Sequence, residues 1–207
     1  MFISPRHIEY GGGLPLKDRP LADQIDLFAA KIDGWHLLIA DRCINGWADD
    51  EGKQCIDAPH HGERVNYIPD SGWAVLQMMM NYFEIIGGYK VGEINDANRK
   101  RFQNGFLDVF SRLLTPDCEE IEEIVYKHVR NGLYHIGMDS SKVVLRHQEP
   151  LISFVYNEFQ KQLFVDPHQL IKDLRQHLSE YIMSLKDESQ VDLRKKFSKA
   201  FRSQFKD

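Results

Sequence analysis

The sequence has few cysteines, no long apolar run and no internal repeat, and each absence excludes a class of protein. Its three cysteines are an odd number at wide spacing in 207 residues, so they form no disulfide framework. No apolar run approaches the roughly 20 residues that span a bilayer. Residues 1–13 have neither the basic start nor the apolar stretch of a signal peptide. We therefore expect a cytoplasmic protein that does not enter a membrane.

The composition is that of a folded globular chain. Hydrophobic residues make up 43% and charged residues 28%, with a net charge of -5. The apolar fraction is too high and the charge too balanced for a disordered chain. A length of 207 residues fits one domain that needs neither disulfides nor a metal to fold, so we expect a single domain over residues 1–207.

The clearest helical pattern lies near the N-terminus. Apolar residues at spacings of four and three share one helical face there: Leu21, Ile25, Phe28, Ile32, Trp35 and Ile39. The pattern predicts a helix from about Pro20 to Ala48, with Pro20 in its first turn. Residues 49–71 show no periodicity and form a functional lid, a poorly ordered loop or a small irregular hairpin.

A second helix is predicted over residues 73–89, and it is apolar on nearly all sides, as central buried helices are. Its polar exceptions, Gln77, Asn81 and Glu84, are spaced four and three apart and share one narrow stripe. Because buried polar groups need partners, we expect this stripe to face a hydrogen-bonded core contact or a partly wet groove rather than to be a catalytic face.

The remaining segments complete a mainly α fold. They predict a third helix at 102–113 capped by Asp96, a fourth from Thr115-Pro116-Asp117 to between Gly132 and Gly137, strands at 142–146 and 152–156, a fifth helix at 166–182 and a last helix at about 189–205. We therefore expect a helical bundle with a core at about residues 20–185. A short two-strand insertion separates the fourth helix from the C-terminal helices.

The fourth helix closes with the segment Arg130-Asn131-Gly132-Leu133-Tyr134-His135. An arginine, a polar residue directly after it and a histidine after four intervening residues resemble the signature of the HEPN superfamily. The resemblance covers about residues 20–185 and implies a HEPN-like helical bundle, which in many members is a metal-independent ribonuclease. It assigns catalytic roles to Arg130, Asn131 and His135. Tyrosines near such motifs can be modification targets in the family, but for Tyr134 we favour a ring packed on the helix end.

The residues of this motif suit RNA cleavage by the neighbouring 2′-hydroxyl. Histidine can take or give a proton near neutral pH, and arginine grips phosphate oxygens and stabilises charge that develops on them. In an unbroken helix Arg130 and His135 would lie about 140° apart, so they must converge through a helix end near Gly132, through the reach of the arginine or through a second chain. Asn131 would orient His135 or the substrate.

One histidine cannot easily serve as both acid and base in one step. The resemblance implies that two chains share a composite cleft, so we expect a homodimer that acts on RNA, in a toxin or defence role and with an antitoxin protein as a further candidate partner. The alternative is a non-catalytic HEPN-like module that binds nucleic acid, nucleotide or a protein. A third hypothesis is a scaffold in which Arg130 pairs with Glu84, Glu120 or Glu123 and His135 caps the helix.

Other candidate sites are weaker. Glu84 and His128 are candidate accessory residues of the motif. His128, Asn131 and His135 share a helical face, but no acid completes a metal set. A second candidate zinc set is scattered at spacings that match no zinc motif: Cys43, Cys55, His60 and His61. No phosphate-binding loop or dinucleotide fingerprint is present, so we expect no cofactor and no metal.

The last predicted helix is strongly basic. Six positive residues and no acid lie between 194 and 206, and the rest of the chain then carries 20 positive against 31 negative residues. The basic face either tracks a phosphate backbone, docks on the acidic surface of its own bundle or is simply solvated while the Phe197/Phe201/Phe205 stripe packs. The pattern favours packing with a solvated basic face.

Overall fold

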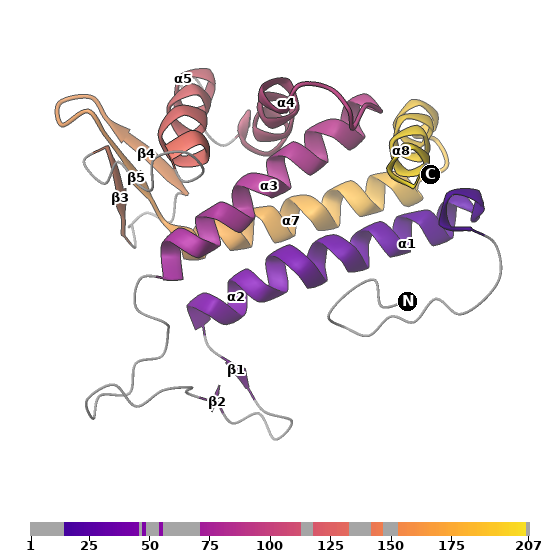
Figure 1. The fold of residues 1–207 in the computed structure, drawn as a ribbon, viewed down its shortest axis with the longest axis horizontal. Coiled ribbons are helices and arrows are strands. Elements are labelled where there is room, and N and C mark those ends of the chain that lie inside the picture. Colours follow the sequence, from indigo (N-terminus) through magenta and orange to yellow (C-terminus); the bar gives the residue numbers. More distant parts are fainter. Residues whose placement is uncertain are drawn as a thin grey trace.

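The computed structural model describes residues 15–45, 47–48, 54–55, 71–112, 118–132, 142–146 and 153–205. It is mainly helical with a small strand insertion, as predicted. The helices in chain order are η1 (Leu16–Asp18), α1 (Leu21–Ile32), η2 (Asp33–Leu37), α2 (Leu38–Asn45), α3 (Ser71–Val91), α4 (Asn98–Phe110), α5 (Cys118–Ile124), η3 (Val125–Arg130), α7 (Pro167–Lys186) and α8 (Val191–Gln204). In Figure 1, the sheet lies at one end of α7 and α8 at the other, with α3, α7 and α1 running lengthwise between them.

The first long helix contains a π-helical turn that shifts its buried face. Ile25, Phe28 and Ile32 are buried as predicted, but Trp35 is 48% exposed. The next core residue after Ile32 is Leu37, five positions on, because η2 inserts one residue into the helical repeat. The helix therefore buries Leu37, Ala40 and Ile44 instead of continuing through Trp35, and it ends at Asn45 rather than at Ala48.

Two glycines set the distance between α3 and α4. A Cβ atom on Gly87 of α3 would overlap the carbonyl oxygen of Arg101, and one on Gly105 of α4 would overlap the carbonyl oxygen of Phe83. Only glycine permits this reciprocal approach of two helix backbones. The α3–α4 crossing therefore brings the residues around Glu84 within reach of the start of α4.

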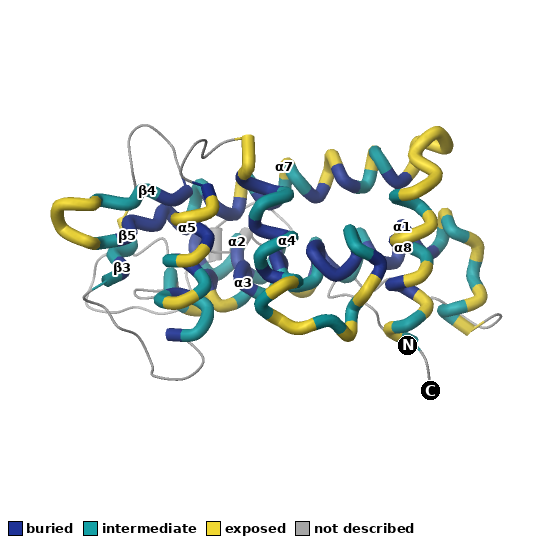
Figure 2. The backbone as a smooth tube through the Cα atoms, turned by 90° about the horizontal axis from the view of Figure 1, so that it is seen from above, coloured by how far each residue is buried: buried dark blue, intermediate teal, exposed yellow. Residues whose placement is uncertain are grey.

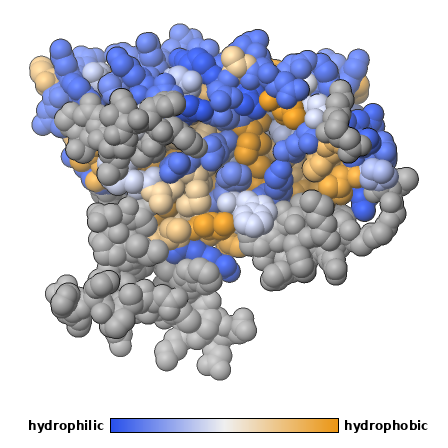
Figure 3. Space-filling model, in the orientation of Figure 1, coloured by the Kyte–Doolittle hydropathy of each residue, from blue (hydrophilic) through white to orange (hydrophobic). Residues whose placement is uncertain are grey.

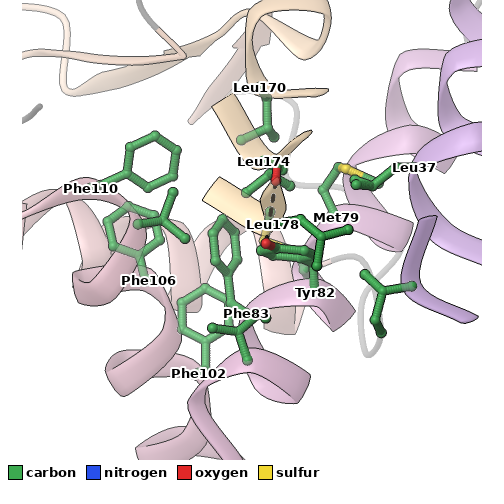
Figure 4. Close-up of a cluster of buried hydrophobic side chains, with 14 of the residues drawn as sticks. Leu37, Met79, Tyr82, Phe83, Phe102, Phe106, Phe110, Leu170, Leu174 and Leu178 are labelled. Carbon is green, nitrogen blue, oxygen red and sulfur yellow. Dashed lines mark hydrogen bonds between the residues drawn. The ribbon is translucent and has the colours of Figure 1, made fainter. Parts of the chain in front are cut away.

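Aromatic side chains fill the space beside this crossing. Phe83 lies with its ring centroid 5.2–5.9 Å from those of Phe102, Phe106 and Phe110, and Figure 4 shows these rings on one side of Tyr82. Met79 and Leu37 lie on the other side of Tyr82 in this view, and Leu170, Leu174 and Leu178 of α7 lie between the two groups in the same core cluster. The nearly all-round apolar pattern of residues 73–89 thus reflects a central helix, α3, as predicted.

The strand insertion has three strands, and the prediction of two was wrong. β3 (Val143–Leu145) and β4 (Phe154–Asn157) fall within or beside the predicted segments, but both pair with β5 (Gln162–Val165), which the prediction missed. The order is β3-β5-β4, with β3 parallel and β4 antiparallel to β5. Leu163, Phe164 and Val165 are all buried, so the central strand shows no polar alternation in the sequence.

The helix starts agree with the predicted caps in part. Asp166 caps α7 by accepting the N–H groups of His168 and Gln169, with Pro167 at the first helical position. The cap predicted for α4 was wrong by one residue, since Ala97 stands at the N-cap and the Asp96 side chain accepts the Ala97 N–H. Leu113 and residues 115–117 lie outside the described residues.

The segment after α2 is described only where it forms a two-stranded pairing. β1 (Trp47–Ala48), which falls in the range predicted as helix, pairs antiparallel with β2 (Gln54–Cys55). Of residues 49–71, only β2 and Ser71 are described, so the choice between lid, loop and hairpin stays a prediction. Residues 56–70 lie outside the described part. Among the described residues, no helix combines the length and the apolar composition needed to cross a bilayer.

We expect Gly87→Ala to lower the free energy of unfolding by about 3 kcal/mol or more, because the added methyl meets a backbone carbonyl that no side-chain rotation can move. The control is Gly88→Ala in the same helix, where the nearest atom to a new Cβ is 3.2 Å away. That variant should lose less than about 1 kcal/mol, since alanine also favours the helix. Urea unfolding followed by circular dichroism measures both, and equal losses would contradict the role of Gly87.

Candidate functional site

The described part of the predicted motif, residues 130–132, lies in a helix that changes its winding. α5 continues directly as the π-helical segment η3, and Asn131 and Gly132 extend it by two helical residues. Ile121, Val125 and Val129 are buried and hold this helix on the core. The widened turn in η3 places Arg130 at the edge of the packed region.

Arg130 is held by two neighbours. Its Nε donates a hydrogen bond to Glu84 Oε1 at 2.7 Å, and its Nη1 donates to Asn131 Oδ1 at 3.2 Å. The two charged side chains are 13% and 14% exposed. Of the three carboxylates considered as partners for Arg130, the structure selects Glu84, which also explains the polar position in α3.

Glu84 belongs to a larger group of charges, which we call the arginine cluster: Arg99, Arg101, Arg130, Glu84, Glu122 and Tyr126. Arg101 Nη2 lies 4.0 Å from Glu84 Oε2, and Arg101 Nη1 donates to the carbonyl of Ile94 at 2.6 Å. The cluster therefore joins α3, the start of α4 and the motif helix around one shared carboxylate.

The second carboxylate of the cluster is the more deeply buried one. Glu122 is 1% exposed and forms a two-point ion pair with Arg99, in which Nη2 to Oε2 is 2.8 Å. The hydrogen bond to Glu122 raises the pKa of Arg99 above its usual value. The guanidinium carbons of Arg99 and Arg130 lie 4.5 and 5.7 Å from the centroid of the Tyr126 ring. The Tyr126 ring is thus within cation–π distance of both guanidinium groups.

Only part of the predicted site falls within the described residues. Glu84, Arg130 and Asn131 are brought together, and the half-buried His128 lies two positions before Arg130. Tyr134 and His135 lie outside the described residues, so their convergence with Arg130 stays a prediction. The sequence reasoning missed Arg99, Arg101, Glu122 and Tyr126. The signal that could have found the first two is the basic run Arg99-Lys100-Arg101 at the start of α4.

A second polar network crosses the core between α3, α4 and α7. The buried Tyr82 hydroxyl lies 2.8 Å from His177 Nδ1, His177 Nε2 lies 2.9 Å from Asp108 Oδ2, and Lys90 Nζ lies 2.9 Å from Asp108 Oδ1. Burial would raise the pKa of Asp108, but the hydrogen bonds from His177 and Lys90 outweigh it and lower that pKa. Because Tyr82 is fully buried, we interpret this network as a structural contact that holds α3, α4 and α7 together.

The structure gives the candidate metal sets no further members. Cys43 is half-buried and burial raises the pKa of its thiol, whereas the side chains of Cys55, His60 and His61 lie outside the described residues. In the described part of the chain, no three potential ligands among histidine, cysteine, aspartate and glutamate form a group that could hold a metal ion.

No family model, no curated protein and no solved structure matches this chain.

The Glu84–Arg130 pair should be strongly coupled because both partners are largely buried. In a double-mutant cycle of Glu84→Gln and Arg130→Gln, we expect a coupling energy of about 2 kcal/mol. The matched control is the exposed pair Glu93–Lys199, whose cycle should give less than about 1 kcal/mol. Equal coupling in both cycles would contradict the role of Glu84 in fixing Arg130.

Asp108 should make stability depend on pH. Its folded pKa is lowered from the ordinary 3.8, so its contribution is present above about pH 4 and is lost as the pH falls through the folded value. We expect Asp108→Asn to cost about 2 kcal/mol at pH 7 and to weaken the acid destabilisation below about pH 4. Urea unfolding at both pH values measures this, and Asp26→Asn, at an exposed ion pair, is the control. An unchanged acid destabilisation in Asp108→Asn would contradict the assignment.

Proposed function

We propose that the protein is a metal-independent endoribonuclease of the HEPN toxin or defence type. The observation that supports the proposal is the fixed position of the Arg130 side chain. Its Nε donates to Glu84 at 2.7 Å, and its Nη1 donates to the adjacent Asn131. A guanidinium fixed before the substrate arrives needs little reorganisation to stabilise a charged phosphate. His135 follows five residues later in the sequence and supplies the group that can exchange a proton.

In the proposed reaction, the 2′-hydroxyl of one nucleotide attacks the adjacent phosphorus and the bond to the 5′-oxygen of the next nucleotide breaks. A base takes the 2′-hydroxyl proton, an acid protonates the leaving 5′-oxygen, and a 2′,3′-cyclic phosphate forms. His135 performs one of these proton transfers. Arg130 contacts the phosphate oxygens, where negative charge accumulates, and Asn131 orients His135 or the substrate.

The second proton transfer requires a second group, and a homodimer would provide it. Two motif helices packed together would place one His135 as the base and its copy as the acid in a shared cleft. Tyr134 and His128, of which His128 is half-buried, are accessory candidates in that cleft. The same proposal includes a cytoplasmic location, RNA as the substrate and an antitoxin protein as a further partner.

The second candidate function is a non-catalytic HEPN-like module that binds nucleic acid, nucleotide or a protein partner. The specific observation in its favour is the ion pair itself, since Glu84 already neutralises Arg130 and both side chains are largely buried. An arginine committed to a carboxylate has less positive charge to offer a phosphate than an unpaired one. The scaffold hypothesis rests on the same pair.

The test is cleavage of RNA by the purified full chain in EDTA, with wild type beside His135→Ala. We expect cleavage that survives chelation and falls by about 10²–10⁴-fold in the variant, as for loss of a proton-transfer group. The control is His168→Ala, at the start of α7 and outside the arginine cluster, which should keep full activity.

Three outcomes separate the hypotheses. Equal cleavage by wild type and His135→Ala would contradict the proposal. Absence of cleavage with retained RNA binding would favour the non-catalytic module. Absence of both cleavage and RNA binding would favour the scaffold.

A further inference from the structure

α8 packs the middle of its apolar face, Phe197, Ala200 and Phe201, against the core. Phe197 and Phe201 are 0% and 2% exposed, and Phe197 packs 5.3 Å from Phe28 and 5.2 Å from Tyr89 between ring centroids. The Tyr89 hydroxyl also donates to Gln204 Oε1 at 2.9 Å. The helix is therefore a fixed part of the molecule, and its apolar face cannot insert into a lipid surface.

A close backbone contact fixes α8 further. Gly92 follows α3 with a φ of 79°, and a Cβ atom there would lie 3.2 Å from the Cα of Lys196. Ser198 of α8 donates to Gln24 of α1 at 3.2 Å, and Arg194 donates to the carbonyl of Leu185 at 2.9 Å. Groups carried by α8 are thus held on a rigid element.

The opposite face of α8 carries an exposed row of cations, which we call the α8 stripe: Lys195, Lys199 and Arg202. Their spacings of four and three place them on one helical face over about 10 Å of helix axis. The helix has five positive side chains and one negative, Asp192 in its first turn. Figure 3 shows that hydrophilic residues dominate the upper part of the face where Figure 1 places α4, α5 and α8.

The α8 stripe is not used to dock the helix on its own bundle. In the described part of the chain, Lys195 and Arg202 have no carboxylate partner. Lys199 pairs with Glu93, but both side chains are more than half exposed, so the pair is worth little and a phosphate can replace Glu93. Of the alternatives predicted for this helix, docking on the acidic body is therefore limited to one surface pair. Figure 2 shows how exposed positions recur along α8.

A chain of contacts connects the α8 stripe to the candidate catalytic arginine. Lys199 contacts Glu93 in the turn after α3, and the carbonyl of the next residue, Ile94, accepts from Arg101. Arg101 lies 4.0 Å from Glu84, which holds Arg130. The two basic groups are thus linked through the α3–α4 turn and the start of α4.

We propose that the α8 stripe binds the phosphate backbone of single-stranded RNA and holds a strand that continues toward Arg130. A row of exposed cations on a rigid helix matches the repeating negative charge of a strand without reading its bases. The buried apolar face argues against a membrane, since an interfacial helix must offer that face to lipid. The choice of RNA as the ligand rests on the proposed function.

The test measures binding rather than cleavage, so that it stands apart from the test of catalysis. The triple variant Lys195→Gln, Lys199→Gln and Arg202→Gln is made in a His135→Ala chain, which leaves the RNA intact. Its binding to a labelled single-stranded RNA of about 20 nucleotides is followed by fluorescence anisotropy over a range of salt concentrations. We expect about 10-fold weaker binding at low salt and a salt slope reduced by about 2, or roughly 0.7 for each lost phosphate contact.

The control removes the same charge elsewhere. Lys161→Gln, Lys172→Gln and Lys186→Gln, also in the His135→Ala chain, remove three exposed cations from outside α8, and should keep the parent affinity within about 2-fold. Equal loss in both triple variants would overturn the proposal, because net charge alone would then explain it. An unchanged affinity of the stripe variant, or a parent chain that does not bind RNA, would overturn it as well.

The outcomes for binding and catalysis are distinguishable. Weaker binding by the stripe variant supports the α8 stripe even if the wild type cleaves no RNA, whereas cleavage without that weakening supports only the catalytic site. Vesicles of phosphatidylcholine and phosphatidylserine at roughly 3:1 test the lipid surface. Binding to these vesicles in place of RNA would overturn the proposal in favour of a membrane.

Discussion

The close crossing of α3 and α4 is the constraint on which the rest of the structure depends. Gly87 and Gly105 let each helix rest on a carbonyl of the other, so that no side chain separates the two backbones. This approach puts Phe83 among the rings of α4 and puts Arg101 beside Glu84. The same contact thus organises an apolar cluster on one side and an ionic one on the other. The carboxylate that holds Arg130 is positioned by two residues that have no side chain.

Three carboxylates at the contacts between helices are paired with cations, whereas the fully buried Asp166 accepts backbone N–H groups at the start of α7. Glu84 and Glu122 are each paired with arginine, and Asp108 is paired with lysine and histidine. A buried carboxylate without such partners would be strongly destabilising, so each pair is required wherever its carboxylate is retained. The positive charges of α8 lie on the surface instead, where hydration makes their retention inexpensive in free energy. The described part of the chain thus has cations that lie largely buried beside carboxylates and cations that are exposed on α8.

The sequence predicted the helices whose apolar residues follow a regular pattern. The prediction of the buried face failed where one extra residue shifts that pattern. The amphipathic patterns of α7 and α8 predicted their positions because each helix keeps a regular repeat, and α3 was predicted from its nearly continuous apolar sequence. The prediction that Trp35 lies on the buried face was wrong, because the π-helical turn at Asp33–Leu37 shifts the register of the helix. A local sequence pattern does not reveal such a turn. β5 was missed because a strand buried on both faces has no alternation. Of the candidate site, the link from Arg130 to Glu84 was among the foreseen alternatives, whereas Arg99 and Arg101 come from a helix start that only the tertiary crossing brings near.

The position of β5 has a consequence for the order in which the chain can assemble. β4 and β5 are joined by a turn of four residues, 158–161, so this hairpin can form locally, and Asp166 then caps α7 one residue beyond β5. β3 must instead close a loop that includes β4 before it reaches its parallel partner, and longer loops carry a larger entropic cost of closure. The pairing of β4 with β5 and the cap of α7 therefore involve only residues close together in the sequence. β3 joins this sheet only when the longer loop has closed.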